Sequence, residues 1–179
     1  MNSSVVQLYR SSEYVEQPWK NGQGVTLQVA SSDREAGPEQ GDKSENSRAH
    51  WRVSIATLSA DGDYSDFSGY RRSQLMLEGE PLDLSVDSSG DGLQQVAMKP
   101  LSMLSFDGAT PVNCRLASGP AKMLNVMSLR SEVCHQLRVV SAADHCDRLF
   151  HGSGPVLIFC LADELSIKVG RRQYCLNRN

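Results

Sequence analysis

Arginine and asparagine residues within otherwise apolar segments are the strongest candidates for a binding site in this sequence. Arg52 and Ser54 alternate with apolar residues, Arg72 opens an apolar segment, and Asn125 lies between two methionines. Side chains two positions apart on a strand share a face, so these groups would converge if that face points into a barrel. A guanidinium matches a carboxylate, and such a charge-assisted hydrogen bond contributes about 1.5–3 kcal/mol. The pattern predicts an anion or amide site; the alternative is arginine heads solvated on the barrel surface.

Histidine and cysteine spacing gives no support for a metal site. The sequence has no HxH and no HExxH. In each of the pairs Cys134-His135 and His145-Cys146, the two neighbouring side chains would point to opposite sides of a strand and could not bind one metal together. There is also no GxSxG elbow, no GxGxxG and no P-loop, although a Cys/His dyad stays open. We therefore expect no metal ligand, no cofactor and no catalytic residue.

Period-two alternation predicts strands along most of the chain. The expected strands cover residues 25–29, 51–56, 74–77, 82–86, 112–116, 123–127, 136–140, 156–161 and 165–169. Glycine-containing turn signals such as Asp61-Gly62 and Asp107-Gly108 separate them. One or two helical turns are expected over 11–17, ended by Pro18. Many short strands of this kind indicate an all-β sandwich or barrel with little helix.

Composition narrows the classes of partner. The 179 residues carry a net charge of −3 with a sequence pI near 5.8, so no basic field would gather nucleic acid or an anionic membrane. The longest apolar run, residues 156–161, is far shorter than the roughly 20 residues that span a bilayer, and it reads as a buried strand. The start of the chain shows no export signal, which predicts a cytoplasmic protein. Five cysteines without a CxxC predict reduced thiols.

The segment 31–48 is almost wholly polar and predicts a mobile surface loop outside the core. The length of the chain suits one globular domain or two small fused halves. Strand edges make a homodimer a reasonable state.

Several short motifs occur in one order between about Pro18 and Arg130. They are PWKNGQGVT at 18–26, WRVSIA at 51–56, DGDYSDFSGYRR at 61–72, LEG at 77–79, FDG at 106–108, GP at 119–120 and NVM at 125–127. In this order and spacing the chain resembles the HutD/Ves family of cupin-like proteins.

The resemblance implies a bicupin, in which two β-barrel halves of jelly-roll type pack as one unit over 1–179. It also implies a cytoplasmic bacterial protein linked to histidine utilisation, without established enzymatic activity. Such a protein would act as a regulator, or governor, that binds a small compound such as urocanate or formylglutamate. Metal-binding cupins carry an HxH motif followed by Glu, which this family and this sequence lack.

Family positions carry over to the matching residues of this sequence. Gly22 matches the entry motif of the family, and Gly69 matches the segment after its central strand. Arg52 and Arg72 are the expected partners of a carboxylate or formyl oxygen. The expected ligand-binding residues are Trp19, Lys20, Asn21, Arg52, Ser54, Phe67, Arg72 and Asn125.

Three features of the sequence depart from the family pattern. Ser68 stands where the family often has Pro, and Met123 stands where Asp is common, which removes a charge partner for an arginine. The sequence ends at Asn179, soon after Tyr174, where family members usually continue through further strands. We therefore expect an abbreviated C-terminal half with a more open second barrel.

Two other classes of function stay open. One is a small-molecule enzyme, an isomerase or hydrolase of amino-acid catabolism, that would use the same pocket with Lys20, an Asp or a Glu as acid or base. The other is an interaction protein that works through an exposed sheet or through the acidic 31–48 segment.

Overall fold

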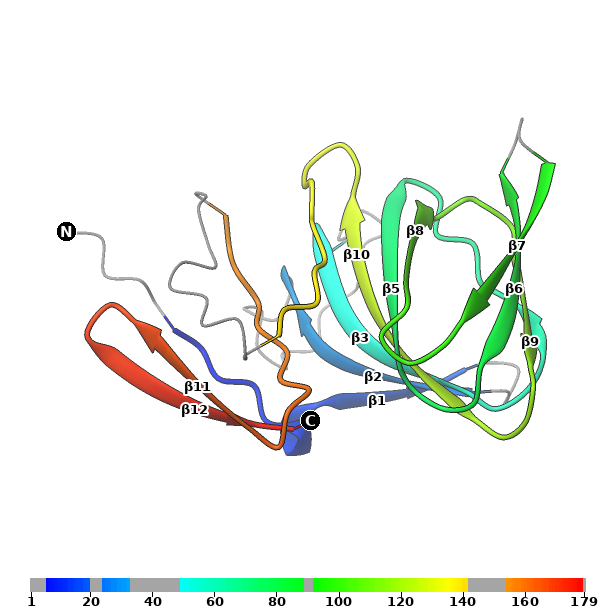
Figure 1. The fold of residues 1–179 in the computed structure, drawn as a ribbon. Coiled ribbons are helices and arrows are strands. Elements are labelled where there is room, and N and C mark those ends of the chain that lie inside the picture. Colours follow the sequence, from blue (N-terminus) through cyan, green and yellow to red (C-terminus); the bar gives the residue numbers. More distant parts are fainter. Residues whose placement is uncertain (1–5, 20–23, 33–48, 89–91, 142–153, 179) are drawn as a thin grey trace. The chain divides into compact units, whose positions relative to one another are not determined.

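A computed structural model describes residues 6–19, 24–32, 49–88, 92–141 and 154–178 (Figure 1). The chain divides into two compact units. The larger unit comprises residues 13–137, and the smaller unit comprises residues 1–12 and 138–179. Among the described residues, no helix has the length and apolarity needed to cross a membrane. The predicted 31–48 loop lies almost entirely outside the described residues.

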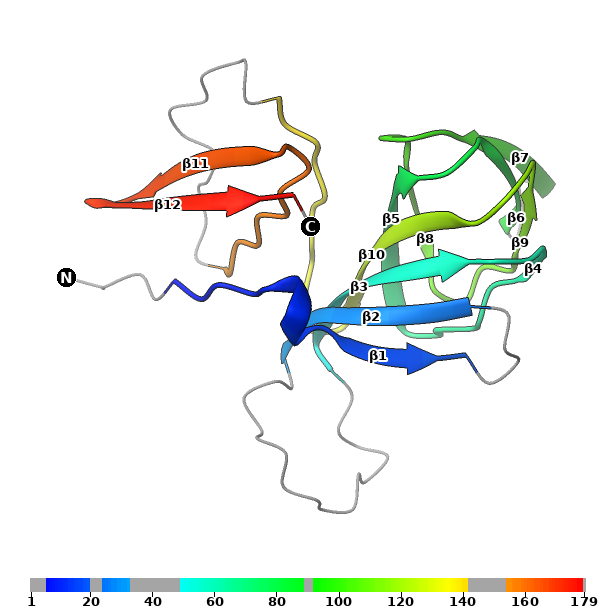
Figure 2. The ribbon, with the colours of Figure 1, turned by 90° about the horizontal axis from the view of Figure 1, so that it is seen from below.

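The larger unit contains two antiparallel sheets (Figures 1 and 2). The first sheet has the order β1-β2-β3-β10-β5-β8 and the second has the order β4-β9-β6-β7. Strands of the first sheet, in spatial order, are β1 (Val15–Pro18), β2 (Gly24–Ser31), β3 (Trp51–Leu58), β10 (Ala121–Leu129), β5 (Tyr70–Glu78) and β8 (Met103–Asp107). Strands of the second are β4 (Gly62–Asp63), β9 (Val112–Leu116), β6 (Leu82–Ser88) and β7 (Gly92–Met98).

The strand order is that of a jelly roll. Successive strands from β3 to β10 alternate between the two sheets, except that β6 and β7 form a hairpin within the second sheet. A jelly roll of this kind joins two Greek keys and places the inward residues of both sheets in one core. The all-β fold predicted from the sequence is therefore confirmed.

The core lies between the two sheets. Met76 of β5 and Met123 of β10 face Leu82 and Leu84 of β6, and all four are almost completely buried. Because side chains alternate along a strand, the residues two positions along from these methionines share the same inner face. This alternation carries polar residues into the interior of the larger unit.

The described residues of the smaller unit contain one antiparallel hairpin, β11 (Glu164–Val169) paired with β12 (Arg172–Asn177). Gly170 takes a positive φ of 59° in its turn, a conformation that glycine adopts without steric cost. Whether this unit is the second barrel of a bicupin stays a prediction.

Most expected strands are present, and β9 matches its predicted range of 112–116. Two local predictions were wrong, and a third holds only in part. Residues 136–140 and 156–161 form no strand, and Val156 is 53% exposed rather than buried. The helical prediction for 11–17 holds only for a single 3-10 turn, Ser11–Glu13, because β1 pairs with β2 from Val15 onward. Backbone pairing with a neighbouring strand outweighs weak local helix propensity.

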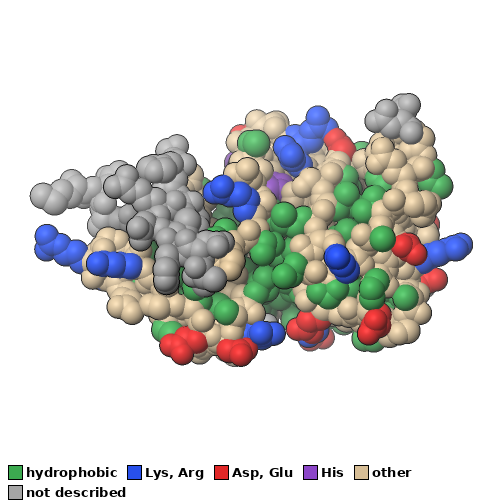
Figure 3. Space-filling view, in the orientation of Figure 1, with side chains coloured by type: hydrophobic (Ala, Val, Ile, Leu, Met, Phe, Trp, Pro, Cys, Tyr) green, Lys and Arg blue, Asp and Glu red, His purple; other side chains and the backbone are tan. Residues whose placement is uncertain are grey.

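Figure 3 shows charged side chains of both signs scattered over the described part of one face of the molecule.

Candidate ligand-binding site

The cross-strand register places the predicted arginines and asparagine on one face of the first sheet. Met127 of β10 pairs with both Arg52 of β3 and Arg72 of β5. Two residues earlier on β10, Asn125 pairs with both Ser54 of β3 and Gln74 of β5. Asn125 also shares a strand face with the core residue Met123, as the alternation predicted.

Asn125 is the centre of a buried hydrogen-bond cluster. Its Oδ1 accepts from Gln74 Nε2 at 2.6 Å and from Arg72 Nη2 at 3.3 Å. Its Nδ2 donates to the Met123 carbonyl oxygen at 3.3 Å, which fixes the orientation of the amide. Arg72 Nη1 donates to the Ser65 carbonyl oxygen at 3.3 Å. With 5%, 6% and 2% exposure, Asn125, Arg72 and Gln74 are held out of bulk water.

Three aromatic rings surround the Arg72 guanidinium. Its central carbon lies 5.3 Å from the ring centroid of Tyr64 and 5.1 Å from those of Phe67 and Phe106. Each distance lies within the range of a cation–π contact. The rings exclude solvent and supply partial compensation for the buried positive charge.

Gly108 holds the backbone that carries Phe67. Phe67 N–H donates to the Gly108 carbonyl oxygen at 2.9 Å, and Gly108 N–H donates to the Tyr70 carbonyl oxygen at 2.7 Å. A Cβ at position 108 would lie 2.1 Å from the Phe67 carbonyl oxygen, which is a severe clash. The close approach therefore requires glycine here.

Several polar atoms of this cluster lack a hydrogen-bond partner among the described residues. They are Arg72 Nε, the Gln74 Oε1 atom and the Tyr64 hydroxyl. The nearby Gln74 amide lowers the pKa of Tyr64, but the two side chains do not reach hydrogen-bond geometry. Each unpaired buried polar group costs about 1–3 kcal/mol. The cluster thus presents one unused donor, one unused acceptor and one hydroxyl that can do either.

Burial disfavours charge at this site. Burial lowers the pKa of Arg72 to about 10. The nearby Arg52 also lowers this pKa, whereas the Tyr64 side chain raises it by favouring the cation. Burial also raises the pKa of Tyr64 well above its usual range, with Cys114 acting in the same direction and Arg72 in the opposite one. Tyr64 is therefore neutral and Arg72 is a cation at neutral pH, without an anionic partner in the described residues.

The other predicted residues lie at varying distances from this cluster along the same sheet. Arg52 Nη2 donates to Gln17 Oε1 at 3.1 Å, and Arg52 Nε is buried with no hydrogen-bond partner in the described ranges. Burial lowers the pKa of Arg52. Ser54 is buried on β3, and Asn125 of β10 lies between it and Gln74 of β5. Trp19 Nε1 donates to Thr26 Oγ1 at 2.8 Å, so its polar atom points to β2 rather than to the Arg72 cluster. Lys20 and Asn21 lie outside the described residues.

Three members of the cluster were not predicted as site residues. Gln74 follows Arg72 at a spacing of two, so strand alternation alone could have identified it. Tyr64 and Phe106 come from a short strand-flanking segment and from β8, and only the folded chain brings them to Arg72. No local sequence signal identifies them.

No group of three or more histidine, cysteine, aspartate or glutamate residues in the described ranges could hold a metal ion. The donors around Arg72 are amide, guanidinium, hydroxyl and aromatic groups. They suit hydrogen bonding to an organic molecule rather than coordination of a cation.

Two antiparallel sheets in jelly-roll order, with a polar cluster on the inner face of one of them, define a cupin-like protein. The comparison with family models goes further: the model described as HutD matches residues 11–179, and the chain belongs to this family.

Two relatives by sequence come from different bacterial genera. The chain is 28% identical over 170 residues to an uncharacterized 21.2 kDa protein in the hutC 3′ region of Pseudomonas putida, covering 95% of this chain and 81% of that protein. It is 29% identical over 141 residues to protein Ves of Escherichia fergusonii, covering 78% of this chain and 64% of that protein.

Two solved structures share the fold. HutD from Pseudomonas fluorescens SBW25, in a formate condition, superposes with a TM-score of 0.56 and 31% identity over 68% of this chain. The conserved protein of unknown function PA5104 from Pseudomonas aeruginosa PAO1 gives a TM-score of 0.58 and 28% identity over 72% of this chain. In each superposition, 59% of the solved chain is matched.

Proposed function

We propose that this protein binds a small carboxylate or formyl compound, such as urocanate or formylglutamate, without a metal, and thereby regulates histidine utilisation in the bacterial cytoplasm. The observation that carries the proposal is the set of unpaired buried polar atoms around Arg72. A protein gains stability by pairing such atoms, so leaving them unpaired fits a site that a ligand completes.

The unpaired atoms favour a ligand that both accepts and donates hydrogen bonds. Arg72 Nε requires an acceptor, such as a carboxylate or formyl oxygen. Gln74 Oε1 requires a donor, such as the N–H of a formamide or of an imidazole. Formylglutamate carries a formamide with both groups, and urocanate carries an imidazole N–H together with a carboxylate. A bare carboxylate would satisfy only the arginine.

The relatives support the proposed setting. One relative is encoded in a hutC 3′ region, and one solved relative is HutD studied in a formate condition. The HutD family assignment itself links the chain to the hut system.

A thermal-shift panel tests the proposal. A ligand that binds only the folded state stabilises it by RT ln(1 + [L]/Kd), so a ligand at 100 times its Kd adds about 2.7 kcal/mol. We expect urocanate or formylglutamate to raise the melting temperature of the wild type, with or without a chelator, and to be recovered unchanged. Histidine and simple carboxylates complete the panel.

Two variants make the panel specific. Arg72→Met keeps an unbranched apolar stem and removes the cation, so it should lose the shift. Arg115→Gln, at an exposed position on β9 of the other sheet, should keep it. Absence of a shift with every compound would overturn ligand binding, loss of the shift on adding chelator would overturn metal independence, and conversion of the ligand would establish the enzyme instead.

A further inference from the structure

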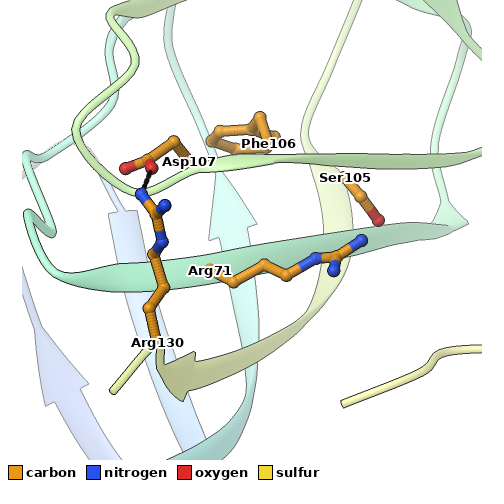
Figure 4. A pocket seen from close by; sticks show the side chains of 5 residues that line it. All are labelled: Arg71, Ser105, Phe106, Asp107 and Arg130. Atoms are coloured by element: carbon orange, nitrogen blue, oxygen red, sulfur yellow. Dashed lines mark hydrogen bonds and ion pairs between the residues drawn. The ribbon is translucent and has the colours of Figure 1, made fainter. Parts of the chain in front are cut away.

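A second polar site lies on the opposite face of the first sheet from the Arg72 cluster. Arg71 and Ser73 alternate with Arg72 and Gln74 along β5, so they point to the outer face. A pocket of about 300 Å³ opens there, lined by residues from β5, from β8 and from the segment that follows β10 (Figure 4). Its lining residues are Arg71, Ser105, Phe106, Asp107 and Arg130.

The pocket has a positive balance of charge. Arg130 forms an ion pair with Asp107, which neutralises that carboxylate. Arg71 has no hydrogen bond or ion pair among the described residues, and Figure 4 shows its guanidinium extended toward Ser105. The Phe106 ring lies on the other side of β8, where it contacts Arg72. The polar groups of the pocket are therefore two guanidinium ions, one hydroxyl and one carboxylate that is already paired.

A chain of hydrogen bonds leads from the pocket into the protein. Ser105 Oγ lies 2.7 Å from Ser73 Oγ, which lies 2.9 Å from His135 Nε2. The other ring nitrogen, His135 Nδ1, lies 2.6 Å from Ser128 Oγ. Ser73 and Ser128 are buried, with 4% and 0% exposure, so bulk water does not compete for these bonds.

The hydrogen bonds of this series can be donated in either of two directions, and only one direction suits an anion in the pocket. If His135 Nε2–H donates to Ser73, then Ser73 donates to Ser105 and the Ser105 hydroxyl is free to donate into the pocket. In the reverse direction Ser105 donates inward and offers the pocket only lone pairs. An anion beside Arg71 selects the first direction, and a protonated His135, which donates from both nitrogens, enforces it.

We propose that this outer pocket binds an oxyanion group, a phosphate or a carboxylate, between the Arg71 guanidinium and the Ser105 hydroxyl, with Arg130 as the second cation. Guanidinium and hydroxyl donors are the groups that proteins use for such anions. The site is independent of the ligand proposed for the Arg72 cluster, because the two clusters point to opposite faces of β5.

The hydrogen-bond chain predicts a link between anion binding and His135. The charged groups that line the pocket are Arg71 of β5, Asp107 of β8 and Arg130 after β10, while β10 contributes the neutral Ser128 next to His135. Burial, followed by the charge of Arg71, lowers the pKa of His135. An anion that neutralises Arg71 raises that pKa again, so anion affinity increases as the pH falls through it.

The test is an NMR titration of the full chain with inorganic phosphate, and in parallel with acetate, at pH 7.5 and constant ionic strength set by chloride. We expect saturable shifts of the Arg71 side-chain Nε–H and of the His135 ring signals with at least one of the two anions. The anion that binds more tightly identifies the chemical group. Shifts that grow linearly without saturation, or that match those given by chloride, would overturn the proposal.

Three variants locate the binding. Arg71→Gln should weaken it by about tenfold or more, and Ser105→Ala by about two- to tenfold, in line with a charge-assisted and a neutral hydrogen bond. Arg115→Gln, an exposed arginine of the other sheet, should bind as the wild type does. Unchanged affinity in both Arg71→Gln and Ser105→Ala would overturn the proposal. Repeating the titration with sulfate, whose charge is constant over pH 5–8, should show tighter binding at the lower pH.

Discussion

Replacing Arg72 by methionine should leave the stability of the free protein nearly unchanged, although the side chain is only 6% exposed. Burial lowers the pKa of Arg72 from its usual range to about 10, which disfavours the cation in the folded state by ~3 kcal/mol. Two hydrogen bonds of 3.3 Å return about 1 kcal/mol each, and the contacts with the aromatic rings return about 1 kcal/mol more. These terms offset one another, so methionine should change the free energy of unfolding by less than about 1 kcal/mol.

Urea denaturation of the wild type, Arg72→Met and a control, Met76→Ala, measures the difference. Met76 is completely buried in the core, and its truncation should cost about 2–5 kcal/mol. A loss of more than ~2 kcal/mol in Arg72→Met, at an unchanged m value, would refute the reasoning. It would mean that Arg72 holds the fold together rather than serving a ligand.

Further predictions concern the neighbours of Arg72 and the histidine network. Asn125→Ala leaves Gln74 Nε2 and Arg72 Nη2 without their acceptor, so denaturation should show a loss of about 2–5 kcal/mol, and a loss below ~0.5 kcal/mol would contradict the cluster. Because the pKa of His135 is lowered in the folded state, the unfolded chain takes up this proton at a higher pH, and stability should fall as the pH drops from 7 to 5. Denaturation at both pH values should show a smaller fall in His135→Gln than in the wild type. An equal fall in the two proteins would be inconsistent with this role of His135. Gly108→Ala should shift the Phe67 backbone, lower the melting temperature and weaken ligand binding, whereas wild-type values for both would show that the clash relaxes freely.

Period-two alternation predicted much of the first sheet because it is a local property of the chain. It identified the face shared by Arg52 and Ser54 and the one shared by Asn125 and Met123, which the observed register brings onto a single sheet face. It did not identify the partners of those residues. Gln74 and Asn125 are 51 positions apart, and only the pairing of β5 with β10 brings their amides within 2.6 Å.

The local pattern failed where an apolar run has no sheet to join. Residues 156–161 have the composition of a buried strand, but in the structure Val156 and Leu157 are exposed and unpaired in any ladder of the described residues. Conversely, β7 has the sequence GLQQVAM, which alternates poorly, and it forms because β6 offers a complete antiparallel ladder. Tertiary pairing outweighs intrinsic strand preference in both cases.

The most direct test of the ligand-binding claim is to follow the Arg72 side-chain Nε–H signal by NMR while formylglutamate or urocanate is added, with calorimetry on the same sample. Arg72 Nε is a buried donor without a partner among the described residues, so a ligand that completes the site must change its environment. We expect a saturable shift of this signal with the same midpoint as the heat of binding. If a ligand binds by calorimetry while the Arg72 Nε–H signal does not shift, Arg72 is not part of the binding site.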